Sequence, residues 1–233
     1  MEPDDARVIR RFFRTATPQC LKDRLLPFEA ALKSQATQFC RRHRDRLILD
    51  VGCGRECYDS NTIGLDLRFS NLCGRHHRVV CANAMELPFV SGCFDAALCS
   101  ASFHHFENPE QALTEMHGVL RKGGELLLTI PDQFPKTKAR DDHWRFDRVS
   151  IVSILEKTGW KMAMCSPIGG RFWILSRYSL EWLFRWDHGF RLAIFALAAP
   201  VVGLLLPLAC FYLDRFVRKK SQTLGWAIVA THE

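Results

Sequence analysis

Short apolar runs, separated by segments of helical or turn character, are the feature that most limits what this chain of 233 residues can fold into. Continuous apolar strands with helices between them are typical of a parallel sheet that is covered on both faces. The pattern therefore predicts an α/β domain with a mostly parallel sheet. The expected strands are 46–51, 61–66, 78–83, 94–100, 125–130, 160–166 and a last one within 223–233.

One helix is marked at both ends by its sequence. Asn108 is expected to cap it and Pro109 to occupy its first position. Apolar residues recur at helical spacing up to Leu120, and we expect the pair Gly123-Gly124 to stop the helix. Two more helices are expected, one over 27–40 and one that begins at Asp147 or Ser150 and ends at 157.

The chain is basic, with 32 Lys and Arg against 25 Asp and Glu and a formal charge of +7. The basic residues gather in Arg7–Arg14 and Arg41–Arg46, and neither run belongs to a nucleic-acid recognition motif. Attraction to an anionic membrane surface explains the charge equally well. We therefore expect no nucleic-acid partner.

The ten cysteines include no CxxC pair, and several of them lie in apolar runs, as buried free thiols do. A zinc site would require paired, closely spaced ligands. The first residues, MEPDDARVIRRFF, lack the apolar segment of a signal peptide. We therefore expect a reducing, cytoplasmic environment, no disulfides and no metal.

The stretch LILDVGCGRECYDSNTIGLD begins like a nucleotide-binding loop, with an apolar strand, an acid and Gly-x-Gly. A lone Gly-x-Gly is a weak signal, but after the first strand it lies where open parallel sheets bind ligands. A dinucleotide requires a third glycine and a helix amino terminus at its pyrophosphate. Here Glu56 takes the place of that glycine, and only eleven residues separate Gly54 from Asp66, too few for a helix and a strand.

Both departures favour S-adenosylmethionine over NAD or FAD. The molecule has no phosphate and carries an ammonium and a sulfonium, so the carboxylates of Asp50 and Glu56 are tolerable beside it. Asp66, at the end of the second strand, has two oxygens that are able to accept both ribose hydroxyls. We therefore expect S-adenosylmethionine as the cofactor.

These motifs, with the sequence that follows them, resemble class I S-adenosylmethionine-dependent methyltransferases of the type 11 group. LDVGCG is similar to their first motif, GLDL to their second, and NAMELPFVSGCFDAALCSASFHHFENPEQALTEMHGVLRKGGELLLTIP to their later ones. The resemblance spans about 47–166 and implies an α/β, Rossmann-like, doubly wound, mostly parallel seven-stranded sheet. It also places the last strand, which holds LGWAIVA, beside the fifth, after an apolar helical insertion.

The resemblance implies roles for individual residues. The loop Gly52–Gly54 would face the methionine part of the cofactor, Asp66 the ribose and Leu67 the adenine. Asn83 stands where the family usually has Asp, and it would face the adenine amine through its amide oxygen. The complete set of expected cofactor-binding residues is Asp50, Gly52, Cys53, Gly54, Asp66, Leu67, Asn83, Ala84, Met85, Ser100 and Ala101.

Two histidines are candidates for the base that an oxygen nucleophile requires. His105 follows the fourth strand and His143 follows the fifth, on the rim of the expected pocket. For His105 the alternative is packing or a hydrogen bond to the backbone. For His143 the alternative is a loop anchored by Trp144, with solvated acids. The sequence by itself does not choose a base.

Residues 192–213 carry no charge and are numerous enough to cross a membrane. However, we expect Pro200 and Pro207 to break helical hydrogen bonds, and one full crossing would separate the last strand from its sheet. The expectation is therefore a bent helical hairpin that enters one leaflet, flanked by aromatic and basic residues. A buried cap over the core or a dimer interface is the alternative.

The expected parts of the chain are N-terminal helices (1–46), a methyltransferase core (47–166), the apolar insertion (167–221) and the last core strand (222–233). The expected function is methyl transfer to a small-molecule or lipid-linked acceptor by a cytoplasmic protein, with peripheral contact to the inner face of the membrane. The alternative is a non-catalytic, membrane-associated protein that retains the fold. The sequence does not determine the acceptor or the oligomeric state.

Overall fold

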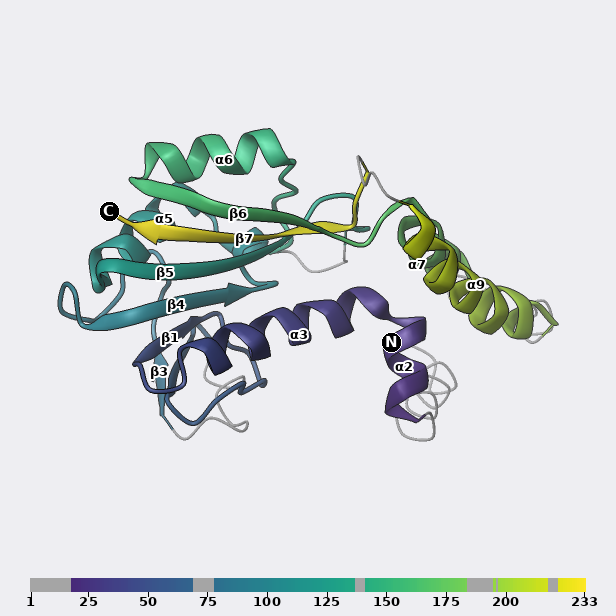
Figure 1. Ribbon diagram of the computed structural model, residues 1–233, viewed down its shortest axis with the longest axis horizontal. Helices are drawn as coiled ribbons and strands as arrows, with labels where there is room; N and C mark the ends of the chain where they lie inside the picture. The colour runs from purple at the N-terminus through teal and green to yellow at the C-terminus, as the bar shows by residue number, and fades with distance from the viewer. Residues whose placement is uncertain (1–17, 69–77, 137–140, 184–194, 196, 218–221) are drawn as a thin grey trace. The chain divides into compact units, whose positions relative to one another are not determined.

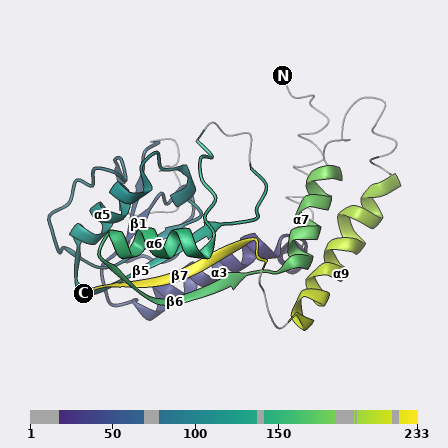
Figure 2. The same ribbon diagram turned by 90° about the horizontal axis from the view of Figure 1, so that it is seen from above.

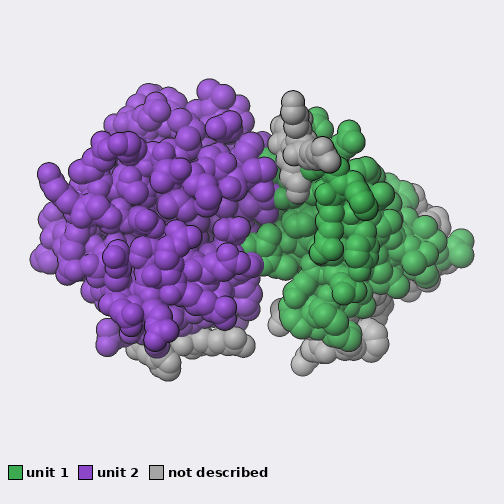
Figure 3. Space-filling view, in the orientation of Figure 1, with its two compact units in different colours: residues 1–31, 133–135, 169–224 green, residues 32–132, 136–168, 225–233 purple. Residues whose placement is uncertain are grey.

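The computed structural model describes residues 18–68, 78–136, 141–183, 195, 197–217 and 222–233. It divides into two compact units, which Figure 3 shows in different colours. Unit 2 holds 32–132, 136–168 and 225–233, and unit 1 holds 1–31, 133–135 and 169–224. All strands of the sheet therefore belong to unit 2, and most of the apolar insertion belongs to unit 1.

Unit 2 is built on one seven-stranded sheet with the order β3-β2-β1-β4-β5-β7-β6 (Figure 1). Neighbours from β3 to β5 are parallel, and β7 lies antiparallel between β5 and β6. The predicted sheet is confirmed, and so is the return of the last strand beside the fifth. The strands are β1 (Ile48–Val51), β2 (Thr62–Asp66), β3 (Val79–Cys81), β4 (Phe94–Ser100), β5 (Leu120–Pro131), β6 (Trp160–Ile168) and β7 (Gly225–His232).

The sheet is covered on both faces because successive side chains of a strand point to opposite sides. Leu49 and Leu126 share a buried cluster with the apolar faces of α5 (Pro109–Val119) and α6 (Arg148–Lys157). Their neighbours Ile48 and Leu127 belong to a second cluster, which includes Ala36, Phe39 and Cys40 of α3 (Pro27–Arg42). Figures 1 and 2 show α5 and α6 on one side of the sheet. This double cover explains why the central strands are apolar throughout.

Helix α5 begins as predicted but ends earlier. The Asn108 side chain caps it by accepting a backbone N–H of the first turn at 3.1 Å. The predicted last residue, Leu120, is off by one, because the helix stops at Val119 and β5 begins at Leu120. The predicted stop signal is wrong, since the glycine pair 123–124 lies within the strand. Leu120 pairs with Phe94 of β4 before the register shifts. Pairing of Leu120 with β4, and not the glycine pair, therefore marks the end of the helix. Asp147, not Ser150, caps α6.

Unit 1 is helical in the part of it that is described, and α9 packs against α7 and α2. From Ala199 to Phe216 the chain forms one helix of 18 residues, and only 17% of this stretch is buried. It is the one helix among the described residues that is long and apolar enough to cross a membrane. The helices are α2 (Gln19–Leu25), the first turn of α3, α7 (Arg171–Leu183), η4 (Ala199–Leu205), α9 (Leu206–Leu213) and η5 (Asp214–Phe216).

The two prolines of this helix do not break it, contrary to the expectation from sequence. Pro200 lies in the first turn of η4, but the chain is already helical at residues 197 and 198, so its missing N–H removes one donor without ending the helix. Pro207 lies in the first turn of α9, at the point where the π-helical pattern of η4 changes to α. No turn divides residues 199–213, so this described part of the stretch does not form the expected hairpin. Residues 192–194 and 196 and the expected flanking residues Trp186, Arg218, Lys219 and Lys220 lie outside the described residues.

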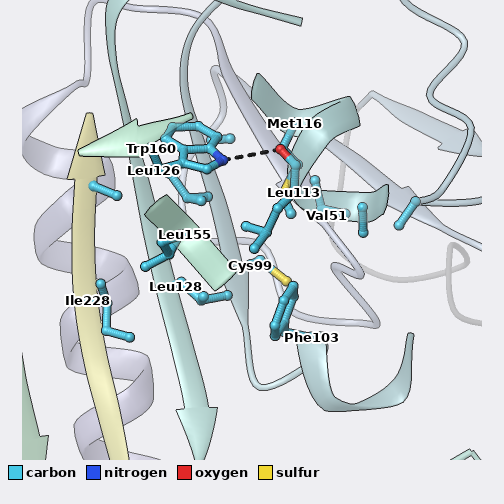
Figure 4. Packing of buried hydrophobic residues seen from close by; sticks show 14 of the residues in the cluster. Val51, Cys99, Phe103, Leu113, Met116, Leu126, Leu128, Leu155, Trp160 and Ile228 are labelled. Atoms are coloured by element: carbon cyan, nitrogen blue, oxygen red, sulfur yellow. Dashed lines mark hydrogen bonds between the residues drawn. The ribbon is translucent and has the colours of Figure 1, made fainter. Parts of the chain in front are cut away.

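Trp160 joins β6 to α5 in the core of unit 2. Its ring is buried, and its Nε1 donates to the Leu113 carbonyl at 3.1 Å (Figure 4). Trp160→Phe removes this donor from a buried site, so we expect the free energy of unfolding to fall by about 1–3 kcal/mol. The control, Trp144→Phe, removes an exposed bond to the Phe106 carbonyl and should cost less than about 1 kcal/mol. Urea denaturation measures both, and equal losses would contradict this role of Trp160.

Candidate functional site

The expected site residues follow the carboxyl ends of β1, β2, β3 and β4. The chain moves outward from β1 to β2 and β3 and then returns to β4 on the other side of β1. Open α/β sheets bind ligands at such a reversal, outside the carboxyl ends of the strands. The topology therefore gathers the segments 50–54, 66–67, 83–85 and 100–101 at one edge of the sheet.

The loop Gly52–Gly54 turns back toward the end of β2. The N–H groups of Gly52 and Cys53 both donate to the Leu65 carbonyl, at 2.7 and 3.0 Å. Gly52 has a φ of +73°, and a Cβ at this position would lie 2.4 Å from the Cβ of Ser102. Glycine is thus required at position 52 both by the backbone conformation and by the close approach of the turn after β4.

Asp66 holds the other side of this loop. Its Oδ2 accepts the Gly54 N–H at 3.1 Å, and its Oδ1 accepts the Arg68 N–H at 2.9 Å. A carboxylate offers about four acceptor positions. Both oxygens are therefore oriented by the backbone of the loop, and the ribose role of Asp66 stays a prediction.

The connection from Gly54 to β2 contains no helix, since residues 52–61 form turns and irregular structure. Glu56 points away into solvent, where its side chain is 55% exposed and pairs with Lys33 at 3.3 Å. No helix amino terminus is therefore present at this loop to receive a pyrophosphate. The helix-free connection agrees with the cofactor inferred from the short spacing, which has no phosphate.

Asp50 is buried in β1, two residues before Gly52. Burial raises the pKa of its carboxyl well above the usual range, and the nearby Asp66 carboxylate raises that pKa further. Its Oδ2 has no hydrogen-bond partner among the described residues. An unpaired buried polar atom is costly, and a ligand that brought a donor to this end of β1 would relieve that cost.

The residues expected near the adenine lie in the turn after β3. The amide oxygen of Asn83 accepts the Met85 N–H at 3.0 Å, so Asn83 stabilises its own turn and keeps a second lone pair. Ala84 is buried, whereas Leu67 after β2 is exposed at the surface. An amide is therefore compatible with this turn, because its oxygen accepts the backbone N–H as a carboxylate oxygen would.

Ser100 and Ala101 form a strained turn at the end of β4. Ala101 has a φ of +54°. Among the residues that the structure describes, it is the one non-glycine residue with a positive φ. Its N–H lies 3.1 Å from both the carbonyl and the hydroxyl oxygen of Thr129, and that hydroxyl donates to Ser100 Oγ at 3.2 Å. Such strain persists only where the surroundings enforce it, and it is common at functional sites.

Two polar residues that sequence analysis did not single out organise this edge. Thr129 of β5 holds the Ala101 turn, and Ser102 Oγ donates to the Val51 carbonyl at 2.8 Å. Neither residue belongs to the glycine motif. Sequence analysis could have found them only by considering which residues the pairing of β4 with β1 and β5 brings next to the loop.

The two predicted bases have different surroundings. His105 lies in η1 (Phe103–His105), and its Nδ1 is 2.7 Å from the carbonyl oxygen of Asp141. The ring of its neighbour His104 is buried, and burial lowers the pKa of His104 to about 4. His143 is exposed, and no described polar group bonds to its ring. The structure therefore fixes the orientation of His105 and leaves that of His143 undetermined.

The requirement for glycine at position 52 is directly testable. Gly52→Ala would force a Cβ into Ser102 as well as a left-handed backbone, so we expect a loss of at least about 2 kcal/mol in unfolding free energy. Gly54→Ala is the matched control, because Gly54 also has a positive φ but no atom within 4 Å of its Cβ position. It should lose only the strain of about 1–2 kcal/mol. Thermal unfolding compares the two, and an equal loss would refute the close-approach explanation.

Comparison with known proteins agrees with this geometry. Residues 49–128 match a family model described as a methyltransferase domain. Over 137 residues the chain is 35% identical to a tRNA (carboxymethyluridine(34)-5-O)-methyltransferase of Xenopus tropicalis, which covers 52% of this chain and 21% of the relative. Over 98 residues it is 36% identical to a fatty-acid O-methyltransferase of Mycolicibacterium smegmatis, which covers 35% of this chain and 36% of the relative.

The fold is similar to the solved structure of a SAM-dependent methyltransferase of Thermotoga maritima, with a TM-score of 0.59 and 16% sequence identity. The alignment covers 98% of this chain and 97% of the Thermotoga chain. The chain spans about three fifths or less of the length of the curated relatives that it matches. The strand order and the structural likeness show the fold of class I S-adenosylmethionine-dependent methyltransferases, and within it residues 49–128 match a methyltransferase domain.

Proposed function

We propose that this protein transfers the methyl group of S-adenosylmethionine to a small-molecule or lipid-linked acceptor. The observation that carries this function is the helix-free glycine loop closed by Asp66, which offers fixed acceptors for ribose hydroxyls and no phosphate site. The cofactor supplies a methyl group on a sulfonium, which is a good leaving group. The task of the protein is to align the acceptor with that methyl group, which supplies roughly 7–11 kcal/mol of the barrier.

The identity of the acceptor is not fixed by the relatives, whose names include tRNA and fatty acids. RNA binding would require cations beside the site. The described basic run, 41–46, instead leads into the amino end of β1, whereas the glycine loop follows its carboxyl end. Within that run Arg42 pairs with Glu125 at 3.6 Å. Arg55 and Arg68 do lie beside the glycine loop, but Arg68 is paired with Asp141 at 2.8 Å. We therefore favour a small or lipid-linked acceptor over RNA.

Contact with an anionic membrane is part of the proposal, and the surface of unit 1 supports it. Leu205 is 58% exposed and Phe216 is 81% exposed on the helix from Ala199 to Phe216. Arg215 lies over the rings of Phe211 and Tyr212, at 5.0 and 5.7 Å from their centroids. Exposed apolar side chains bordered by an aromatic residue and a cation are typical of helices that lie in the membrane interface.

Asp66→Asn tests the cofactor assignment. The amide keeps one acceptor oxygen for the loop but removes the negative charge and half of the acceptor capacity. Because a charge-assisted hydrogen bond contributes roughly 1.5–3 kcal/mol, the affinity for S-adenosylmethionine should fall at least tenfold. Glu56→Gln makes the same change on the exposed side of the loop and should leave affinity unaltered. Titration calorimetry measures both. A wild-type protein that does not bind the cofactor would favour the non-catalytic alternative, and unchanged affinity in the Asn variant would reject Asp66.

The membrane contact is tested with Leu205→Asp combined with Phe216→Asp. Both side chains are exposed, so the fold should survive, while the loss of roughly 1.5–3 kcal/mol per apolar side chain should release most of the protein from anionic vesicles. Val149→Asp on α6 is the control, because it places the same charge on an exposed apolar position of unit 2. Vesicle sedimentation gives the bound fraction. A wild-type protein that does not sediment with vesicles would overturn the membrane proposal.

A further inference from the structure

The short helix η1 is fastened to the cofactor loop, although it follows a different strand. Ser102 Oγ donates to the Val51 carbonyl at 2.8 Å, and the Phe106 ring lies 3.8 Å from the position of a Cβ at Gly52. His105 lies between these two anchors in sequence, and its backbone N–H donates to the Ser102 carbonyl at 2.9 Å. The His105 ring is therefore carried by the same turn that closes the glycine loop.

The hydrogen bond at Nδ1 fixes which nitrogen of His105 carries the proton. Its partner is the backbone carbonyl of Asp141, at 2.7 Å, and a carbonyl oxygen only accepts. In the neutral ring Nδ1 must therefore be protonated, and Nε2 holds the free lone pair. The side chain is 33% exposed, and no described residue forms a hydrogen bond with Nε2.

The segment that supplies this carbonyl is held in place on both sides. The N–H groups of His143 and Trp144 donate to the His104 carbonyl, at 3.1 and 3.2 Å. The Asp141 carboxylate accepts from Arg68 at 2.8 Å, and its other oxygen lies 3.8 Å from His105 Nδ1. The carboxylate is therefore placed to stabilise a positive charge on the His105 ring, and Arg68 holds it there.

We propose that Nε2 of His105 is the general base of the methyl transfer, with Asp141 and Arg68 as positioning residues, and that the acceptor is a hydroxyl or an amine. A carboxylate acceptor has no proton to remove, so its methylation would not require a general base. The proposal rests on the methyl-transfer function above and extends it to the chemistry of the acceptor.

The step balances in atoms and charge. The acceptor proton passes to Nε2, the lone pair of the acceptor oxygen or nitrogen forms the new bond to the methyl carbon, and the electrons of the carbon–sulfur bond stay on sulfur. The ring becomes an imidazolium beside the Asp141 carboxylate, and S-adenosylhomocysteine leaves uncharged at its sulfur. The neighbouring His104 ring, 4.0 Å away between centroids, stays neutral because burial lowers its pKa to about 4.

The first test reads the tautomer and needs no acceptor. Protein with nitrogen-15-labelled histidine is observed by NMR above the pH at which the ring loses its second proton. We expect the signals of His105, assigned by their loss in His105→Asn, to show a protonated Nδ1 and an unprotonated Nε2. A proton on Nε2 would overturn the proposal, because the lone pair would then face the Asp141 carbonyl.

The second test compares acceptors of one chain length, dodecanol, dodecylamine and dodecanoate, with methyl-labelled S-adenosylmethionine. His105→Asn keeps a donor for the Asp141 carbonyl but has no base, so methylation of the alcohol or the amine should fall at least about a hundredfold while cofactor affinity is kept. His232→Asn is the matched control, because His232 Nδ1 also bonds a carbonyl, that of Leu120, at the opposite end of the sheet. Its rate should not change.

Asp141→Asn isolates the positioning effect. It keeps the backbone carbonyl but removes the carboxylate beside the ring, so kcat should fall while KM for S-adenosylmethionine is kept, a split that a purely structural role would not produce. Methylation of dodecanoate alone, or a rate lost in His143→Asn and kept in His105→Asn, would refute the proposal. If none of the three acceptors reacts, the proposal is judged by the NMR measurement of the His105 tautomer. Absence of cofactor binding in the wild type would count against the proposed function, whatever the tautomer.

Discussion

The close approach of Gly52 to Ser102 is the contact on which the arrangement of this site depends. It brings the end of β1 against the turn after β4, and it is sealed by the hydrogen bond from Ser102 to the Val51 carbonyl. Only glycine permits it, because the backbone has a positive φ and no room exists for a Cβ. The cofactor loop and η1 are consequently one rigid assembly at the switch point of the sheet.

This coupling links the cofactor side of the site to its rim. Asp66 orients the loop from β2, Thr129 of β5 holds the strained Ala101, and the backbone of the segment around His143 is tied to η1. Four separate parts of the chain therefore meet through hydrogen bonds in which a backbone group takes part, and the side chains that complete them, Asp66 and Thr129, are short. Such preorganisation is what an in-line methyl transfer requires, since alignment is the main contribution of the protein.

The proposals for the two units complement each other chemically. Unit 1 exposes an apolar helix with Arg215 over aromatic rings, a surface suited to lipid. Unit 2 offers an imidazole whose free nitrogen suits an acceptor with a proton to lose. A lipid-linked hydroxyl or amine would satisfy both, and the fold alone would not distinguish it from other acceptors.

The sequence by itself determined the sheet, the cofactor loop and the absence of a helix after it, because apolar runs, glycine spacing and chain length act locally. It ended α5 within one residue of the observed end, but it wrongly took the glycine pair 123–124 as the stop signal and Pro200 and Pro207 as helix breakers. Strand pairing and a π-helical turn prevailed there over local preference. Thr129, Ser102 and the Asp141–Arg68 pair carried no local signal. Only the tertiary structure decided their roles, and with them which nitrogen of His105 is free, since these contacts join residues far apart in the chain.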